Sequence, residues 1–566
     1  MNKAAIFHRP SREYVIPNSP QKLTFRLLTA RNDCSEIILV HWKRGTNKKF
    51  YNNLLLYSFS EFRDDYRVTI EFDETAHYIQ YYFILKQDDE KDLYFSQENL
   101  FEKETDVKGY FEHAWSNRGD IFKVPEWAKG IVFYQIFPDR FYRLSEKNNP
   151  MLSKWASRPT REDYTGGNLR GIICKLSYLK ELGIQAIYLC PIFKAKFNHR
   201  YATVDYFEID PLLGNKEDLK ELVYKSHELD IKIILDGVFN HVSTEFDKFE
   251  EYKIKGVDNG WFYPNSNKQN TSKIDYECVG DYEPMPKLNT YSIEVKEFLY
   301  SVMKYWIDFA NIDGWRIDVA DEIDIFTLQY LRYKIKDSYP SCLLLGETWG
   351  DGVRNVGFGD QLDCVMNYQF RSAMIDLFAT KKIGCADFVN RIGKTLSCYT
   401  HEVNQCNYNL ISSHDVARFL TECKDDKTMF ALAICFQMTF IGSPAIYYGD
   451  ENEMTGENDP ECRACMNFEK GEICHDLYKE LIDMRSRLVE LKKGDFRFIA
   501  EYVSETSFAF ERKYEDKIKV IFNIGGEKID IRSKSKLLYS YPKNQNNGVL
   551  APYSMVIIKM EENYEK

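Results

Sequence analysis

Polar side chains, most of them ionisable, lie at the ends of several short apolar runs in the middle of the sequence. They comprise carboxylates, histidines, one amide and one arginine, namely Asp236, Asn240, His241, Arg316, Asp318, Glu347, His414 and Asp415. Carboxylates and histidines act as general acids, general bases and nucleophiles. The same groups bind metal ions, and in other proteins they pair with one another. These residue types leave three interpretations open, namely acid–base or nucleophilic catalysis, a metal site, and mutual ion pairing.

The apolar runs before these residues have the pattern of buried parallel strands. Eight runs, most of them followed by a helical pattern, begin at Ile131: IVFYQIFP, AIYLCPIF, KIILDGVFN, IDGWRIDVA, SCLLLGETW, DCVMN, NYNLISSHD and SPAIYYGDE. Continuous apolar runs that alternate with amphipathic stretches are typical of strands covered on both faces. The sequence thus predicts an α/β fold, a (β/α)8 TIM barrel over residues 124–490. The longer gap after the third run predicts a subdomain inserted at residues 242–290.

The two ends of the chain differ from this barrel pattern. Near the N-terminus Val68, Ile70 and Phe72 alternate with polar residues, which is the period of a half-buried strand. This and similar short runs predict a β-sandwich over residues 1–123. After residue 490 the alternation returns in FAFER, KIKVIFNI and MVIIKM, so an antiparallel β-domain is predicted for residues 491–566.

A barrel of this kind would bring the ionisable residues together, because the active sites of TIM barrels lie at the C-terminal ends of the strands. Asp236 and His241 lie at the end of the third run, Asp318 at the end of the fourth, Glu347 of the fifth and Asp415 of the seventh. Burying several like charges together is costly. A shared functional site therefore explains the set better than mutual pairing, although the residue types do not exclude a metal site.

The composition argues against several kinds of partner. Lysine and arginine number 75 against 86 aspartates and glutamates, which gives a net charge of −11. Nucleic acids and anionic membranes need a basic surface, so we expect neither as a partner. The longest apolar run, Met429 to Gly442, is shorter than the roughly 20 residues of a membrane span and predicts a buried helix. The N-terminal MNKAAIFHRPSREY has no apolar stretch long enough for a secretory signal.

The 14 cysteines are scattered along the chain, and several lie within apolar runs. Such a distribution is typical of free thiols in a reducing compartment, so a cytoplasmic location is expected. Cys462, Cys465, Cys474 and His475 include the Cys-x-x-Cys spacing of zinc ligands. The second pair lacks a matching spacer, and no metal site is predicted there.

Several motifs in the barrel segment resemble those of one enzyme family. DGVFNH (236–241), DGWRIDVAD (313–321), GETW (346–349) and SSHD (412–415) resemble, in the same order, the four conserved motifs of the α-amylase family of glycoside hydrolases. MPKLN (285–289) is similar to a fifth motif of its cyclomaltodextrinase, neopullulanase and maltogenic amylase branch. The resemblance extends to FYQIFPDRF, YTGGNLRGI, IYYGDE and GENDPECRACM, and so covers the barrel. The predicted N-terminal β-sandwich fits the starch-binding-like domain of this branch.

The resemblance implies that a pair of carboxyl groups cleaves a glycosidic bond with retention. Asp318 takes the position of the nucleophile and Glu347 that of the general acid/base, about 5–5.5 Å apart. Asp415 resembles the third carboxylate of the family, which hydrogen-bonds the sugar hydroxyls. Arg316 lies two residues before Asp318, so both side chains share one face of a strand. Its charge is expected to keep Asp318 ionised, whereas Glu347 needs a raised pKa to hold its proton.

Five further residues match substrate-binding positions of the family. His241 and His414 would donate hydrogen bonds to hydroxyls of the sugar at the cleavage point, and Tyr201, in NHRYATVDY, would stack on that sugar. Asp459 and Arg463 match a pair that holds the next sugar outward. Without the motifs, the two histidines and Tyr201 would equally fit ordinary packing in a core.

The chain departs from the family pattern at several positions. Ala202 stands where the family usually has Asp, and Asn168 where it often has Asp. The stretch YRLSEKNNP after the first strand lacks the acidic residues that accompany a calcium site, and Ca²⁺ needs several oxygen ligands. We therefore expect no required cofactor and no strong calcium site. VADE replaces the usual VANE after the nucleophile, so Asp321 and Glu322 are expected to alter the acceptor side and the balance of hydrolysis against transfer.

The function that these features imply is retaining hydrolysis of α-1,4-glucosidic bonds, with some transglycosylation. Cyclodextrins and maltooligosaccharides are the expected α-glucan substrates, with pullulan and starch as further candidates. An α-1,6-acting oligoglucosidase or a glucosyl-transfer enzyme of the same family is the alternative. MPKLN and the N-terminal β-domain disfavour the α-1,6-acting member. A non-catalytic sugar-binding relative is a third reading, which the presence of Asp318, Glu347 and Asp415 disfavours. By analogy a homodimer is expected, in which the N-terminal domain covers the site of the partner.

Overall fold

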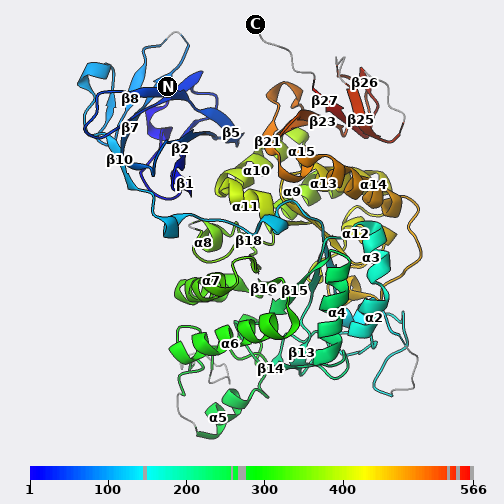
Figure 1. Ribbon diagram of the computed structural model, residues 1–566. Coiled ribbons are helices and arrows are strands. Elements are labelled where there is room, and N and C mark those ends of the chain that lie inside the picture. The colour runs from blue at the N-terminus through cyan, green and yellow to red at the C-terminus, as the bar shows by residue number, and fades with distance from the viewer. Residues whose placement is uncertain are drawn as a thin grey trace.

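A parallel β-barrel occupies the centre of the protein (Figure 1). The computed structural model describes residues 1–88, 90–144, 150–255, 259–264, 276–357, 359–531, 536–543 and 548–560. Within them, eight parallel strands pair in the order β18-β17-β16-β15-β12-β11-β20-β19. Their bounds are β11 (Phe133–Ile136), β12 (Ala186–Leu189), β15 (Lys232–Gly237), β16 (Gly314–Ile317), β17 (Leu343–Gly346), β18 (Cys364–Val365), β19 (Tyr408–Leu410) and β20 (Ser443–Tyr447). A parallel bridge from Met366 to Tyr408 joins the two ends of this sheet, so the barrel is nearly closed.

Each of the eight predicted apolar runs contains one of these strands, which confirms the predicted TIM-barrel fold. Every residue of the eight strands is buried except Lys232, which is half-buried. The strands therefore need apolar side chains on both faces, because side chains fill the inside of the barrel and helices cover its outside.

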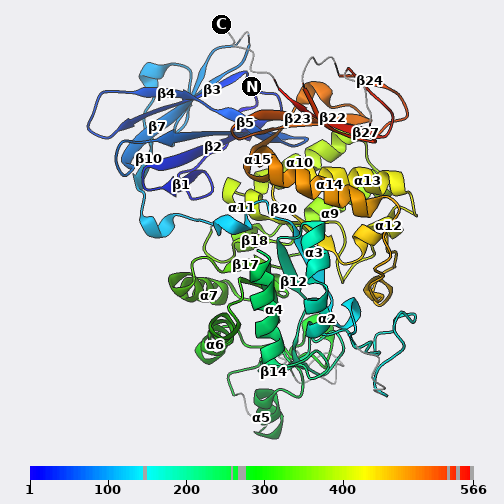
Figure 2. The same ribbon diagram turned by 45° about the vertical axis from the view of Figure 1, so that its right-hand side comes forward.

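Helices surround the barrel (Figures 1 and 2). They are α2 (Leu169–Cys174), α3 (Leu176–Leu182), α4 (Lys216–Glu228), α6 (Ile293–Ala310), α7 (Ile325–Ser338), α8 (Val353–Val356), α9 (Tyr368–Met374), α10 (Cys385–Cys398), α11 (His401–Cys406), α12 (Phe419–Glu422), α13 (Lys427–Thr439), α14 (Cys474–Arg487) and α15 (Val489–Lys493). The predicted buried helix is confirmed, since α13 is buried from Met429 to Thr439. Among the described helices, none combines the length and the apolar composition that crossing a bilayer requires.

Two insertions project from the loops at the C-terminal ends of the strands. An antiparallel hairpin of β13 (Phe193–Ala195) and β14 (Thr203–Ile209) follows β12 and was not predicted. The insertion predicted after the third strand contains α5 (Asp247–Lys255), which the sequence patterns also missed. Within residues 242–290, positions 256–258 and 265–275 lie outside the described part of the chain. An antiparallel bridge from His241 to Lys287 ties the end of this insertion to its beginning.

Antiparallel β-structure precedes and follows the barrel. The N-terminal sandwich packs a sheet of β1 (Val15–Ser19), β2 (Lys22–Ala30), β6 (Arg63–Glu71) and β5 (Leu55–Phe59) against one of β4 (Phe50–Asn53), β3 (Glu36–Lys43), β7 (His77–Lys86), β8 (Leu93–Phe95), β9 (Leu100–Phe101) and β10 (Phe111–Trp115). The C-terminal sheet contains β21 (Asp495–Phe498), β22 (Ser507–Lys513), β23 (Lys517–Asn523), β27 (Ser554–Lys559) and β25 (Lys536–Tyr541), beside a two-stranded sheet of β24 (Ile529–Asp530) and β26 (Val549–Leu550). Both β-regions were expected from the period-two patterns.

A buried carboxylate attaches the N-terminal sandwich to the barrel. Asp65 Oδ2 lies 2.7 Å from Arg67 Nη2 and 3.1 Å from Arg26 Nη2. It also accepts a hydrogen bond of 2.8 Å from Ser397 Oγ at the end of α10. Arg67 donates onward to the carbonyl of Tyr399. Because every charge in this contact is paired, the sandwich has a defined attachment to the barrel.

Candidate active site

Arg316 draws three carboxylates together at the C-terminal ends of neighbouring strands. It lies on β16 with its side chain fully buried, and its Nη1 is 2.5 Å from Asp318 Oδ1 and 2.9 Å from Asp236 Oδ1. Its Nη2 lies 2.9 Å from Oε2 of Glu347, which directly follows β17. The strand register puts Asp236 opposite Arg316, which explains why residues far apart in the sequence meet here. Asp318 and Glu347 are each only 4% exposed.

The backbone beside Asp318 has an uncommon conformation that serves Glu347. Val319 has φ +45°, in the left-handed region that a β-branched residue seldom adopts. In this conformation its N–H donates a hydrogen bond of 2.9 Å to Glu347 Oε2. A left-handed non-glycine residue costs of order 1–3 kcal/mol and persists where its surroundings enforce it. The strand end thus holds the Glu347 carboxyl in place at the cost of local strain.

Burial raises the pKa of two of these carboxyl groups, Asp318 and Asp236. Desolvation raises the pKa of Asp318 well above its ordinary value, Arg316 opposes the rise, and the nearby charges of Glu347 and Asp236 add to it. Desolvation likewise raises the pKa of Asp236 to about 6, although Arg316 and a hydroxyl of Tyr188 counteract it. Arg316 thus lowers the pKa of Asp318, in the direction expected from its charge, but burial among like charges has the larger effect.

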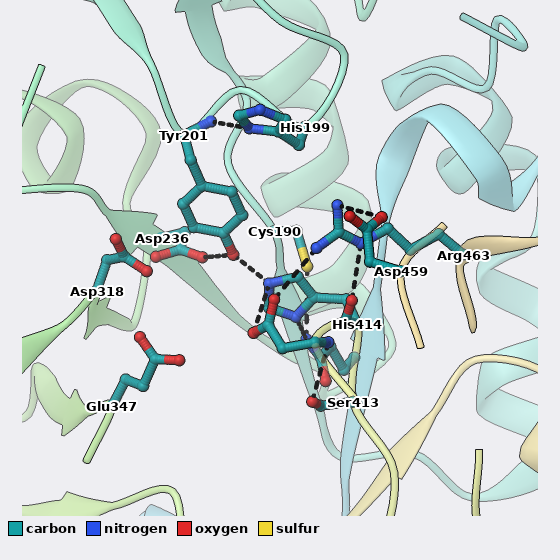
Figure 3. Close-up of polar contacts among 12 residues, drawn as sticks. Cys190, His199, Tyr201, Asp236, Asp318, Glu347, Ser413, His414, Asp459 and Arg463 are labelled. Carbon is teal, nitrogen blue, oxygen red and sulfur yellow. Dashed lines mark hydrogen bonds and ion pairs between the residues drawn. The ribbon is translucent and has the colours of Figure 1, made fainter. Parts of the chain in front are cut away.

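A chain of hydrogen bonds links Asp236 through Tyr201 to His414 (Figure 3). It ends at Gln135. Tyr201 Oη donates to Asp236 Oδ2 over 3.0 Å and lies 2.5 Å from His414 Nε2. Gln135 Nε2, on β11, donates over 2.7 Å to His414 Nδ1. Because Nδ1 accepts this bond, the proton of the neutral ring is on Nε2. Burial, with Arg463 and Arg316 nearby, lowers the pKa of His414 well below its ordinary value and so keeps the ring neutral.

His241 is a second neutral imidazole at the site. It is 2% exposed, and neither ring nitrogen has a hydrogen-bond partner among the described residues. Its Nε2 lies 3.9 Å from Asp318 Oδ2, too far for a hydrogen bond. Burial lowers the pKa of His241 to about 4. A buried ring nitrogen without a partner is costly, so a ligand hydroxyl beside Asp318 would satisfy it.

Arg463 extends the network away from Asp318. It donates from Nε to the carbonyl of His414 over 2.7 Å, and its two terminal nitrogens pair with Asp415 Oδ1 at 3.2 Å and Asp459 Oδ1 at 3.0 Å. Burial raises the pKa of Asp415, while Arg463 opposes the rise. All nine residues singled out from the sequence therefore lie in one connected region at the mouth of the barrel.

Two known protein families match the barrel and the N-terminal sandwich of this chain. A model described as "Alpha amylase, catalytic domain" matches residues 135–487, and one described as "Alpha amylase, N-terminal ig-like domain" matches residues 1–117. The chain belongs to the α-amylase family.

Relatives within the α-amylase family match over their full length. The cyclomaltodextrinase of Thermoanaerobacter pseudethanolicus is 37% identical over 99% of this chain and 100% of its own. Neopullulanase 2 of Thermoactinomyces vulgaris is 38% identical over 93% of this chain and 91% of its own. A solved structure of a cyclomaltodextrinase superimposes with a TM-score of 0.88 at 30% identity, covering 99% of this chain and 98% of that one.

Several residues of this α-amylase-family site escaped the sequence analysis. Gln135 sits inside the apolar run of β11, where a lone amide facing the barrel interior was the available signal. Trp349, which ends the GETW motif, is 51% exposed, and its ring stacks on Tyr368 with centroids 4.3 Å apart. Asp321 and Glu322, in the segment where the chain departs from the family pattern, both form hydrogen bonds. Asp321 accepts from the N–H of Trp349, and Glu322 accepts from Lys287.

Asn168 and Arg143, which lie at the possible calcium positions, form hydrogen bonds within the protein. Asn168 Oδ1 accepts from the N–H of Gly171 over 2.8 Å and caps α2. Arg143 Nη1 donates to the carbonyls of Thr165 and Ser153 over 3.2 and 3.4 Å. Residues 145–149 of the stretch considered for calcium lie outside the described residues. In the part of the chain that is described, no three histidine, cysteine or acidic side chains are grouped to hold a metal ion, and all 14 cysteines are free thiols.

Proposed function

We propose that this α-amylase-family glycoside hydrolase cleaves α-1,4-glucosidic bonds of cyclodextrins and short maltooligosaccharides with retention of configuration. One observation carries the proposal. Asp318 and Glu347 leave adjacent strand ends, are both buried, and are bridged by the single guanidinium of Arg316. Two carboxyl groups that flank the glycosidic bond are what a double displacement at an anomeric carbon requires.

The first step forms a covalent bond between the protein and the sugar. An ionised Asp318 oxygen attacks the anomeric carbon, and the bond from that carbon to the glycosidic oxygen breaks. Glu347 gives its proton to the departing oxygen, so the leaving sugar is neutral. The backbone N–H of Val319, 2.9 Å from Glu347 Oε2, then stabilises the resulting carboxylate.

The second step reverses these roles. Glu347, now ionised, takes a proton from a water molecule, whose oxygen attacks the anomeric carbon while the bond to Asp318 breaks. A sugar hydroxyl in place of the water gives transglycosylation. Each displacement inverts the configuration at the same carbon, so after both steps the product has the anomeric configuration of the substrate.

The remaining polar groups hold the reacting ring. The free ring nitrogens of His241 provide hydrogen bonds to its hydroxyls. The Nε2–H of His414 donates to Tyr201 Oη in the protein without ligand, and a sugar hydroxyl would take the place of that partner. Asp415, fixed by Arg463, accepts hydrogen bonds from hydroxyls that strengthen as the ring distorts toward the oxocarbenium-like transition state. The Tyr201 ring, parallel to the His414 ring within 5°, offers an apolar face to the sugar.

The names of the similar proteins support the substrate class, since they include cyclomaltodextrinases and a neopullulanase. The test is the initial rate on β-cyclodextrin, soluble starch and pullulan, with Glu347→Gln as the blank. We expect the highest rate on cyclodextrin. Equal or higher rates on starch would assign a more open site, and no turnover of any of the three above the blank would overturn the proposal.

We propose that the reaction needs no calcium, because the residues at the position that the family resemblance suggests do not fit the ion. The Asn168 oxygen is used by a helix cap, and the guanidinium of Arg143 already supplies a positive charge to two carbonyl oxygens. Hard cations need several free oxygen ligands. We expect the same activity and melting temperature after dialysis against EDTA and after adding Ca²⁺. A rise of several degrees with Ca²⁺ would contradict this.

We also propose that the protein forms a homodimer and works in the cytoplasm. The edge strand β4 of the N-terminal sandwich exposes Phe50 and Tyr51, which are 46% and 55% exposed, and a second copy would cover them. The 14 free thiols support a reducing compartment. Sedimentation velocity at micromolar concentration should give a dimer that Tyr51→Lys weakens. A wild-type monomer would contradict the assembly, and secretion in the native host would contradict the location.

A further inference from the structure

A cavity of about 350 Å³ opens beside Arg463 and Asp459. Five segments form its walls. Phe197 and His199 come from the hairpin after β12, Tyr282 from the insertion after β15, and Asp459 with Arg463 from the loop after β20. A fourth segment consists of Arg161 and its neighbours Thr160 and Glu162, and Phe137 with Arg140 after β11 form the fifth. Neither Asp318 nor Glu347 lines this cavity, so it is a compartment next to the reaction centre.

The cavity lies on the side of the sugar that stays bound to Asp318. Figure 3 shows Arg463 and Asp459 on the far side of His414 from Asp318 and Glu347. Glu347 protonates the departing oxygen, so the leaving part of the substrate extends past Glu347. The part retained on Asp318 must extend the other way, past His414 and into the cavity. The cavity therefore receives the sugar on the non-reducing side of the one that reacts.

The segment that carries Arg161 is held firmly by a buried arginine. Arg140, which is 2% exposed, donates from Nη2 to the carbonyl and to Oδ1 of Asp163 over 2.8 and 2.9 Å. Asp163 Oδ1 also accepts from the N–H of Thr160 over 3.0 Å and closes the turn. Asn198 donates from Nδ2 to the carbonyl of Asp163 over 2.8 Å. The turn is thus fixed to the barrel and to the hairpin, and it carries the exposed side chain of Arg161.

Arg161 closes the turn onto the opposite wall. Its Nε lies 3.2 Å from Asp459 Oδ2, while Asp459 Oδ1 pairs with Arg463. The Arg161 side chain is 73% exposed, so this ion pair adds little to the stability of the fold. Its position matters instead, because the paired guanidinium and carboxylate join two walls of the cavity at an exposed point.

We propose that Arg161 determines product length by ending the non-reducing side of the cleft after two sugar units, so that the enzyme releases mainly a disaccharide. The inference rests on the proposed function. One unit occupies the reaction centre and one the cavity, whose volume is at the small end of the about 300–1,000 Å³ range of small-molecule pockets. A third unit would have to displace the Arg161 side chain from Asp459.

The test is the distribution of the first products from maltohexaose, measured by chromatography at low conversion. Wild-type protein should give mostly the disaccharide from the non-reducing end. Arg161→Ala should raise the share of trisaccharide about two- to fivefold, the range in which loss of an exposed ion pair changes an equilibrium. Arg161→Lys should lie between the two, because a single ammonium cannot reproduce the planar contact.

Arg158→Ala is the matched control. Arg158 lies on the same segment, is 85% exposed and pairs with Glu461 at 2.6 Å, but does not line the cavity. Its product distribution should equal that of the wild type. An unchanged distribution in Arg161→Ala would overturn the assignment of Arg161 alone. A wild type without any turnover of maltohexaose would instead overturn the proposed function.

Discussion

The centre of the site and its rim are built in different ways. At the centre, Arg316, Asp318 and Glu347 are buried at the ends of neighbouring strands and are tied to one another. At the rim, Arg161 and Trp349 are more than half exposed and extend from loops. Hydrogen bonds between the barrel strands fix the positions of the central residues. The side chains at the rim are held by single contacts with other segments, such as Arg161 with Asp459 and Trp349 with Tyr368. Because of this difference we expect the chemical step to depend on the centre and substrate selectivity to depend on the rim. The expected effects of mutation follow that division.

The largest effect is expected from the two central carboxylates. Asp318→Asn removes the nucleophile and Glu347→Gln the proton donor, so kcat on β-cyclodextrin should fall by at least about 10⁴-fold in each variant. Melting temperatures should change little, because each amide keeps the volume of the acid. Asp351→Asn, an exposed carboxylate after the GETW motif, serves as control and should retain wild-type activity. If either central variant kept a tenth of the wild-type rate, the distinction between centre and rim would fail.

The pH dependence tests the burial of the centre. Asp318 must be ionised to attack, and burial raises its pKa well above the ordinary value. Activity is therefore present above this raised pKa and is lost as the pH falls through it, about tenfold for each further unit. The acidic limb of kcat/KM against pH should lie well above the ordinary aspartate value of about 3.9. A limb at that ordinary value would mean that Arg316 outweighs burial after all.

A smaller effect on kcat/KM is expected at Gln135, which contacts His414 and not the substrate. Gln135→Met leaves Nδ1 of buried His414 without its donor, which costs about 1–3 kcal/mol and should lower kcat/KM roughly tenfold. Gln135→Glu places a carboxylate at the same distance and favours the protonated ring. Its pH profile should gain a dependence near neutral pH that the methionine variant lacks. The same profile in both variants would show that Gln135 fills space only.

The smallest effect is expected at the rim on the leaving-group side. Trp349, stacked on Tyr368, offers its exposed face near Glu347. Trp349→Ala should raise KM for maltooligosaccharides about two- to tenfold and leave kcat nearly unchanged, since ring stacking is worth about 0.5–1.5 kcal/mol. Tyr224→Ala, an exposed aromatic residue on α4, is the control and should change neither constant. A loss of kcat in the tryptophan variant would place Trp349 in the centre.

The sequence predicted the centre well because strand periodicity and motif positions describe the same residues. Asp236 lies near the end of β15, and Asp318 and Glu347 directly follow β16 and β17. The parallel register then leaves little freedom in where they meet. The eight strands were recognisable because a strand buried on both faces cannot contain many polar residues. The exception at the centre is the pKa of Asp318, which depends on the sum of burial and several charges and so required coordinates.

The rim could not be predicted for the opposite reason. Arg161 and Asp459 are about 300 residues apart, as the numbering shows, and their contact depends on the turn that Arg140 and Asp163 hold. No periodic pattern marks such a pairing. The hairpin of β13 and β14 was missed as well, since its first strand has three residues and its register shifts twice. Short irregular elements are placed by tertiary contacts rather than by their own composition.

The most direct test of the proposed mechanism is to trap the covalent intermediate on Asp318. The Glu347→Gln variant is incubated with α-maltosyl fluoride, whose fluoride leaves without a proton donor, and the second step is slow because the general base is missing. Mass spectrometry of the intact protein and of its peptides should show one added maltosyl unit on Asp318. The unit should be absent from an Asp318→Asn, Glu347→Gln double variant. A maltosyl unit on any other residue, or no adduct while fluoride is released with inversion, would contradict the assignment of Asp318 as nucleophile.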